Sequence, residues 1–407
     1  MRRFTCVVLA ILLATTPMLA ASGGPASGQA DSRQADGPFA SSVDGPSVTD
    51  TRTAASIVPS NNTTRRLSLD TLADQTYATP GSDFGATVVM TRDRLSRGLD
   101  VELLTLRTSK ASSPEARKAL VDGQVQQLER QIGELKIAER DAIRAYGAGS
   151  ISDRELLVRL ALVGERAEEL EAAVTAVEDT TGRELRYLHR QVDEYQSETR
   201  QTLMESLEGE REVPVVQLRR AEQGVVVHMV TSTSNGGLYL REAVRLDNRD
   251  TNASTGFSGL SEFFDFVQQE YPYLGQGGTQ WLLAQGDWFH ETTHSQGTVR
   301  FYVDGSERKV YREYQTLRTA ELPVSTTTNV TRDDVVVTAA HTANGGPIKL
   351  TVRTAEGESP LTGAVLVDGQ VVGKTNGNGV LWYVPPAGQH QVTVETADGT
   401  VTVTVPN

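Results

Sequence analysis

Residues 113–149 read SPEARKALVDGQVQQLERQIGELKIAERDAIRAYGAG and predict one long helix. The Ser-Pro pair at its start is typical of an N-cap and a first helical position, and Gly147 and Gly149 would end the helix. Between these limits apolar or small side chains recur in the 4-3 spacing of a heptad repeat, interrupted only at Glu139. The repeat consists of Val121, Val125, Leu128, Ile132, Leu135, Ala142 and Tyr146. Such a repeat is most often the packed face of a helical bundle.

Further helices flank this segment, so residues 66–210 are predicted to form an antiparallel, coiled-coil-like helical bundle. Residues 152–155 (Ser-Asp-Arg-Glu) form a capping box at the start of the next helix. The apolar positions of the flanking segments are Leu95, Leu99, Leu103 and Leu106; Leu156, Leu160, Val163, Ala167, Leu170, Val174 and Val177; and Leu185, Leu188, Val192, Tyr195, Leu203 and Leu207. Short connections between such helices imply antiparallel neighbours.

After Val213 the apolar period changes from 3.5 to about 2, which predicts strands. Residues 211–325 are expected to form a small α+β sheet module with its helix on one face. The predicted strands are Gly224–Thr231, Gly237–Arg245, Thr298–Val303 and Lys309–Thr316, and the helix carries Leu260, Phe263, Phe264, Val267 and Tyr271. The first two strands would pair across a Ser-Asn-Gly turn.

Residues 326–407 predict a C-terminal β-sandwich, and the whole chain is therefore expected to be a multi-domain α+β protein. Thr326–Arg332 is interpreted as a linker. Short strands then follow at even spacing, with glycine-containing turns between several of them. They are Val335–Thr338, Lys349–Arg353, Ala364–Val367, Val380–Tyr383, Gln391–Glu395 and Val401–Val405.

Three resemblances accompany these patterns. Pro360–Ala364, Gly373–Gly379 and Pro385–Gly388 resemble the transthyretin-like fold of carboxypeptidase regulatory domains, an immunoglobulin-like sandwich. That resemblance implies a non-catalytic module used in adhesion or packing. Gly297–Tyr314 is similar to the ends of PepSY-type domains, which implies protease inhibition or envelope chaperoning.

The chain after the spacer also resembles an uncharacterised family of exported haloarchaeal proteins. The resemblance rests on Asn62-Thr63-Thr64, on the helical turn at residues 146–152 and on the stretches at residues 302–305 and 310–313. It implies no known activity.

The N-terminus predicts export. Residues 1–22 combine two arginines, an apolar core and small residues near a cleavage point, as signal peptides do. The Sec and Tat routes both remain open, as does retention of the segment as an anchor. Residues 23–65 are rich in Ser, Gly and Asp and are predicted to be a disordered spacer. The protein is therefore expected to be secreted or extracytoplasmic, and its association with the cell surface stays open.

Composition narrows the class of protein further. The formal net charge is −13, which disfavours nucleic-acid partners. The chain has 6 Lys and 33 Arg, and an acidic surface with few lysines suits a protein in concentrated salt. The single cysteine, Cys6, excludes a disulfide framework or a cysteine-ligated zinc site. Sequons that would permit glycosylation lie at Asn61, Asn62, Asn252 and Asn329.

One motif suggests catalysis. His290, Glu291 and His294 match the zinc-peptidase pattern H-E-x-x-H. However, two threonines inside the motif and glycines on either side favour strands over a helix, and Arg300 stands where metzincins have a third histidine. On a strand the two histidines would lie about 13 Å apart, too far to share one zinc ion. The sequence therefore assigns no catalytic, cofactor-binding or metal-binding residue.

The leading hypothesis is a non-enzymatic, exported cell-envelope protein of a halophilic archaeon that presents or spaces binding modules outside the membrane. Its expected partners are envelope or extracellular proteins or glycans. One alternative is a zinc metallopeptidase that uses His290, Glu291 and His294. Another is a PepSY-like inhibitor or chaperone of exported proteins that acts through the sheet of residues 220–320. No transmembrane segment is expected in the mature chain, and homo-oligomerisation stays open because a heptad repeat can pair within or between chains.

Overall fold

The computed structural model describes residues 67–405, apart from residues 70, 213, 234–235, 251–255, 275–277, 284–285, 333, 343–344 and 357–358. These residues belong to one compact unit, Val58–Asn407. The predicted signal peptide and spacer lie outside the described residues, as do the sequons at Asn61, Asn62 and Asn252. Asn329 occupies an exposed position on a strand.

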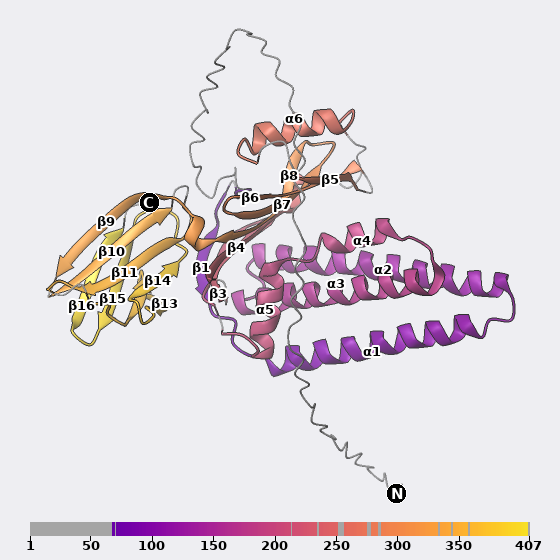
Figure 1. The fold of residues 1–407 in the computed structure, drawn as a ribbon, viewed down its shortest axis with the longest axis horizontal. Coiled ribbons are helices and arrows are strands. Elements are labelled where there is room, and N and C mark those ends of the chain that lie inside the picture. Colours follow the sequence, from indigo (N-terminus) through magenta and orange to yellow (C-terminus); the bar gives the residue numbers. More distant parts are fainter. Residues whose placement is uncertain are drawn as a thin grey trace, which may run out of the picture. The chain divides into compact units, whose positions relative to one another are not determined.

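The N-terminal part of the described chain is helical (Figure 1). Its helices are α1 (Phe84–Ser109), α2 (Pro114–Gly147), α3 (Asp153–Thr181), α4 (Arg186–Asp193) and α5 (Glu198–Glu208). The predicted starts of α2 and α3 are confirmed. The side-chain oxygen of Ser113 accepts a hydrogen bond from the Ala116 amide at 3.1 Å, and that of Ser152 accepts one from Glu155 at 3.2 Å.

The third predicted helical segment is broken into α4 and α5. A single continuous segment is wrong because Ser197 begins a new helix, its hydroxyl accepting a hydrogen bond from the Arg200 amide at 3.1 Å. Leu188 and Val192 of α4 pack with α2 and α3, whereas Leu203 of α5 packs in a core that includes the sheet. The break therefore lets one segment contribute to two different cores.

Helix α1 lies where the leucine spacing predicts a helix, but the four leucines that define it are exposed. Its packed face consists instead of Ala86, Met90 and Leu104. The spacing therefore predicts the helix correctly and does not reveal which face is buried.

Strands from both the N-terminal and the central parts of the chain form one antiparallel sheet. Its described strands run in the order β1-β2-β3-β4-β8-β7-β6-β5. They are β1 (Asp74–Ala78), β2 (Val216–Ala221), β3 (Gly224–Thr233), β4 (Gly236–Arg245), β5 (Thr279–Leu282), β6 (Trp288–His294), β7 (Gly297–Asp304) and β8 (Lys309–Arg318). The predicted hairpin pairings, β3 with β4 and β7 with β8, are confirmed. Strand β1 lies in a region where the sequence predicts no strand.

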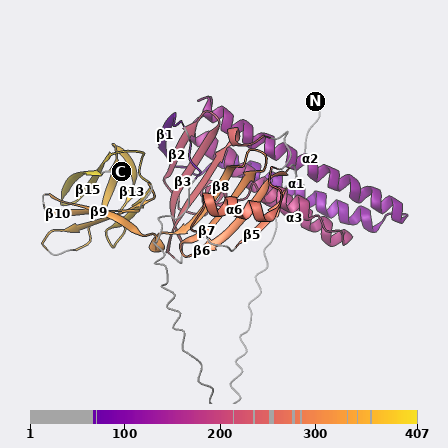
Figure 2. The same ribbon diagram turned by 90° about the horizontal axis from the view of Figure 1, so that it is seen from above.

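Helices cover both faces of this sheet (Figure 2). Alternation of side chains along β3 sends Val225 and Val227 into a core with helices α1, α2, α3 and α5, and sends Val226 into a second core with α6 (Leu260–Glu270). The sequence predicts only the single covering helix α6. The bundle and the sheet therefore share one hydrophobic core.

The C-terminal part is a β-sandwich of two four-stranded antiparallel sheets, as the described strands define it. One sheet has the order β14-β11-β10-β9 and the other β13-β12-β15-β16. The strands are β9 (Val324–Arg332), β10 (Val335–Thr342), β11 (Ile348–Thr354), β12 (Gly363–Val367), β13 (Gln370–Lys374), β14 (Val380–Tyr383), β15 (His390–Thr396) and β16 (Gly399–Val405).

The predicted linker at Thr326–Arg332 is wrong, because these residues lie in the edge strand β9 and pair with β10. The strand is rich in threonine and mostly exposed, so it lacks the alternation of a half-buried strand. No helix in the described part of the chain is long and apolar enough to cross a membrane.

Candidate functional site

The H-E-x-x-H residues lie on strand β6, as the threonines and glycines predict. His290 is fully buried on the α6 side of the sheet, where its ring stacks on Phe301 with centroids 5.0 Å apart. Glu291 lies opposite Arg300 in the register between β6 and β7, and it lines a groove together with Ser197. Successive strand residues point to opposite faces, so Glu291 cannot serve as a base beside His290.

The two histidines also lack further metal ligands. His290 Nδ1 lies 3.1 Å from Gln280 Nε2, and His294 Nδ1 accepts a long hydrogen bond from the Gln296 amide at 3.4 Å. Among the described residues, the Nε2 atoms of both histidines have no hydrogen-bond partner. Across the residues that the structure describes, His, Cys, Asp and Glu form no group of three or more that could hold a metal ion.

Burial lowers the pKa of His290 to about 4. The unfolded chain protonates this residue near pH 6.5, so acid favours the unfolded state between these two values. We expect His290 to cost the fold about 2 kcal/mol of stability as the pH falls from 7 to 5. Urea denaturation of the wild type and of His290→Phe across this range measures the difference.

His189 provides a control of opposite sign. Burial opposes protonation there, but hydrogen bonds with Glu178 and Glu171 outweigh it and raise the pKa. A raised histidine pKa stabilises the fold at acid pH, and this contribution disappears as the pH rises. His189→Gln should therefore lose stability mainly below pH 6.5. A pH profile of His290→Phe identical to that of the wild type would contradict the assignment for His290.

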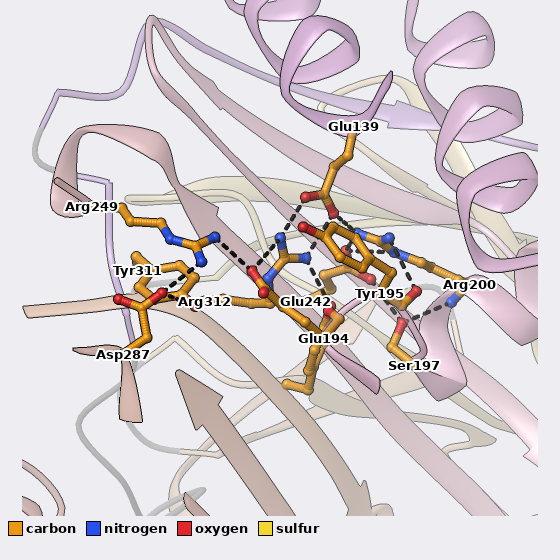
Figure 3. A network of polar contacts seen from close by, with 11 residues as sticks. Glu139, Glu194, Tyr195, Ser197, Arg200, Glu242, Arg249, Asp287, Tyr311 and Arg312 are labelled. Atoms are coloured by element: carbon orange, nitrogen blue, oxygen red, sulfur yellow. Dashed lines mark hydrogen bonds and ion pairs between the residues drawn. The ribbon is translucent and has the colours of Figure 1, made fainter. Parts of the chain in front are cut away.

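In the described structure a buried network of charged side chains lies between the helices and the large sheet (Figure 3). At its centre Glu139 of α2 receives hydrogen bonds from Arg312 of β8 and from Arg200 of α5. Arg200 Nε also donates to Glu242 of β4 at 2.9 Å, and Ser197 donates to the same carboxylate at 2.9 Å. One cluster therefore joins two helices to two strands.

The network continues toward β6. Arg312 also forms an ion pair with Glu194 at 3.5 Å, and Glu194 pairs with Arg249 at 2.8 Å. Arg249 in turn pairs with Asp287 at 2.6 Å, and its guanidinium lies over the ring of Tyr311, 4.3 Å from the centroid. The chain of alternating charges thus reaches from the helix α2 to the start of β6.

The pKa values of the carboxyl groups of Glu139 and Asp287 follow from the position of each group in the network. Burial alone would raise the pKa of Glu139, but Arg312 and Arg200 outweigh it and bring the pKa to about 2. Burial raises the pKa of Asp287 to about 6, because Arg249 offsets only part of the desolvation. Glu139 is therefore a fixed anion. Its arginine partners are buried and already paired, so the centre of the network is built to hold the two layers together.

The sequence does not predict this network, although Glu139 carries one signal of it. It is the single charged residue at a heptad position of α2, and it is buried like its apolar neighbours. A buried carboxylate implies a buried cationic partner. The partners come from distant segments, so the sequence alone could not identify them.

A second set of polar contacts fixes the β-sandwich to the edge of the large sheet. Side chains of β1 and β2 bind the backbone of the loop after β14, at residues 384–387. The hydrogen bonds are Tyr77 Oη to Val384 O (2.6 Å), Gln217 Nε2 to Pro385 O (2.6 Å), Arg219 Nη2 to Pro385 O (3.2 Å) and Ala387 N to Gln75 Oε1 (2.8 Å). We call this set the loop clasp. It joins the sandwich to the core beyond the covalent connection at β9.

The fold and these contacts define a multi-domain α+β protein whose C-terminal module is an immunoglobulin-like sandwich. Residues 326–403 match the archaeal fibronectin-III type-like domain, and residues 216–323 match DUF7094, a family of unknown function. Residues 1–212 match the domain of unknown function DUF7096, which covers more than half of the chain. The chain belongs to the DUF7096 family.

Comparison with curated proteins and with solved structures finds no match. The family matches confirm the coarse prediction of an archaeal family with a C-terminal immunoglobulin-like domain. The halophilic source and the export of the protein stay predictions.

Proposed function

We propose that this protein is an exported, non-enzymatic cell-envelope protein of a halophilic archaeon. Its helix-and-sheet core would hold the fibronectin-III-like sandwich in a fixed position for binding extracellular proteins or glycans. The observation that carries the proposal is the loop clasp, through which β1 and β2 bind the backbone of residues 384–387.

The loop clasp favours a sandwich held in a fixed position over a sandwich that is only tethered to the core by a flexible linker. A flexible linker would leave the sandwich free to reorient, whereas hydrogen bonds to backbone carbonyls restrict it. The buried network around Glu139 supports the same role, because it ties the helices to the sheet that carries the clasp. The finer assignments, PepSY-like for residues 211–325 and transthyretin-like for the sandwich, remain proposals within this function.

Export is the first property to test. Expressed in a haloarchaeal host, the wild type should appear in the envelope fraction or the medium, with a mass that lacks about the first 20–22 residues. Replacement of the apolar core residues Leu9 and Leu12 by arginine should leave a full-length protein inside the cell. Ser27→Arg, outside that core, is the matched control and should be exported normally. Uncleaved wild type in the cytoplasm would contradict the proposal.

Metal content tests the non-enzymatic part. The purified wild type and a His290→Ala, His294→Ala variant should both lack stoichiometric zinc. The measurement is the number of zinc ions per chain, by elemental mass spectrometry of the purified protein. Because the Nε2 atoms of these histidines have no hydrogen-bond partner in the part of the chain that the structure describes, these two histidines are the groups to remove. One zinc per chain in the wild type, lost in the variant, would overturn the proposal in favour of the peptidase alternative.

A further inference from the structure

Helix α1 carries an unusually apolar exposed face. Six large apolar side chains on it are between 44% and 85% exposed, namely Phe84, Val88, Leu95, Leu99, Leu103 and Leu106. At about 100° per residue, most of them fall on the side opposite Ala86, Met90 and Leu104, which pack against the rest of the bundle. Contiguous apolar surface of this kind usually marks an interaction site.

Four of these six apolar residues are arranged symmetrically along the helix about the level of Arg97. Leu95 and Leu99 lie two residues on either side of that level, and Val88 and Leu106 lie nine residues on either side. A two-fold axis through this level and perpendicular to the helix places Leu95 against Leu99, and Val88 against Leu106, of an antiparallel copy. Such a self-complementary surface is what an isologous interface requires. The two outer members of the face do not match in this way, because Leu103 would face Thr91 and Phe84 would face Lys110.

The charges on the face obey the same symmetry. Arg92 and Glu102 interrupt the apolar stripe, and they lie five residues before and five residues after Arg97. Both are exposed, and neither forms an ion pair with another residue in the described part of the chain. In an antiparallel pair each arginine would face the glutamate of the other copy. Within one helix they are about 15 Å apart along the axis, too far to pair.

We propose that α1 is the dimerisation helix of this protein and pairs with α1 of a second copy in an antiparallel arrangement centred at Arg97. Two features favour a second copy over an unrelated partner: four of the six apolar positions match each other, and the opposite charges match each other, in the same register. Ser96 and Gly98 flank the centre, and a Cβ atom at Gly98 would meet nothing within 4 Å in the single chain. At about 100° per residue both lie about 80° from the centre of the face, so Leu95 and Leu99, and not these small residues, would form the contact at the axis. The proposal is independent of export.

Sedimentation equilibrium of the full chain tests the pairing. We expect the wild type to have twice the mass of one chain at micromolar concentration, and Leu95→Glu with Leu99→Glu to be a monomer with unchanged circular dichroism and thermal midpoint. Ile137→Glu, at an apolar position of α2 that is 48% exposed, is the matched control and should remain a dimer.

Charge reversal tests the register. Arg92→Glu alone places carboxylates opposite carboxylates, and Glu102→Arg alone places guanidinium groups together, so each should weaken association by about tenfold. The double variant should regain the affinity of the wild type, because every pair is restored with its signs exchanged. A monomeric wild type would overturn the proposal and point to residues 1–66 or to another protein as the occupant of this face. A dimer that survives Leu95→Glu with Leu99→Glu, or a double charge variant without recovery, would also overturn it.

Discussion

Replacement of Arg200 by methionine (Arg200→Met) should lower the free energy of unfolding by about 3–5 kcal/mol. The Arg200 side chain is fully buried and binds both Glu139 and Glu242. Its removal leaves Glu242 desolvated with only the Ser197 hydroxyl as a side-chain hydrogen-bond partner among these network residues. An uncompensated buried charge costs far more than the pair contributes. The denaturant guanidinium chloride is a salt and would itself screen charges. Urea denaturation at a fixed salt concentration is therefore the appropriate measurement.

The surface pair of Arg159 and Glu155 provides the matched control. Both side chains are close to half exposed, so Arg159→Met should cost less than about 0.5 kcal/mol. High salt should reduce this small effect further while leaving the effect of Arg200→Met nearly unchanged, because buried pairs are weakly screened. Adding Glu242→Leu to Arg200→Met should recover a large part of the lost stability. A loss below about 1 kcal/mol for Arg200→Met would mean that the network does not hold the layers together.

Gly147→Ala should destabilise the fold by about 3 kcal/mol, although alanine is the better helix former. Gly147 is the last residue of α2, and a Cβ atom there would lie 2.3 Å from the carbonyl oxygen of Glu222 and 2.8 Å from that of Ala221. These oxygens belong to the backbone at the turn between β2 and β3, so no side-chain rotation can relieve the clash. Either the end of the helix or the hairpin must move. Thermal and urea unfolding of the variant measure the loss.

Gly133→Ala in the same helix is the control. A Cβ atom at Gly133 would meet nothing within 4 Å, so this change should stabilise the protein by about 0.5–1 kcal/mol. The two substitutions are chemically identical and differ only in what lies beside them. Equal effects of the two variants would show that the contact between α2 and the β2–β3 turn is not as close as described.

Gly147 illustrates how far sequence analysis could go. The sequence predicts that this glycine helps to end α2, and the helix does end there. Gly149 is the residue that adopts a positive φ of 69°, which is what a helix end usually requires of glycine. Gly147 is needed for a different reason, the approach of a hairpin that lies more than 70 residues further along the chain. Local sequence carries no signal for that neighbour.

The histidines of β6 give the opposite case, in which local sequence was sufficient. β-Branched threonines inside H-E-x-x-H and glycines around it predict strands, and β6 and β7 are strands. The alternation of a strand then separates Glu291 from His290 without any knowledge of the tertiary fold. By contrast, the polar strand β9 was missed because its pairing with β10, and not its own apolar pattern, makes it a strand.

The sequence by itself determined the helices α2 and α3, the hairpins β3–β4 and β7–β8 of the large sheet and most strands of the sandwich, because caps, turns and apolar periods act over a few residues. Tertiary structure alone decided that the bundle covers the sheet, that β1 joins its edge, and that Glu139 meets Arg200 and Arg312. It also decided that the buried face of α1 excludes the four leucines whose spacing predicts the helix. Each of these depends on contacts between segments distant in the chain, and such contacts form only when the elements pack.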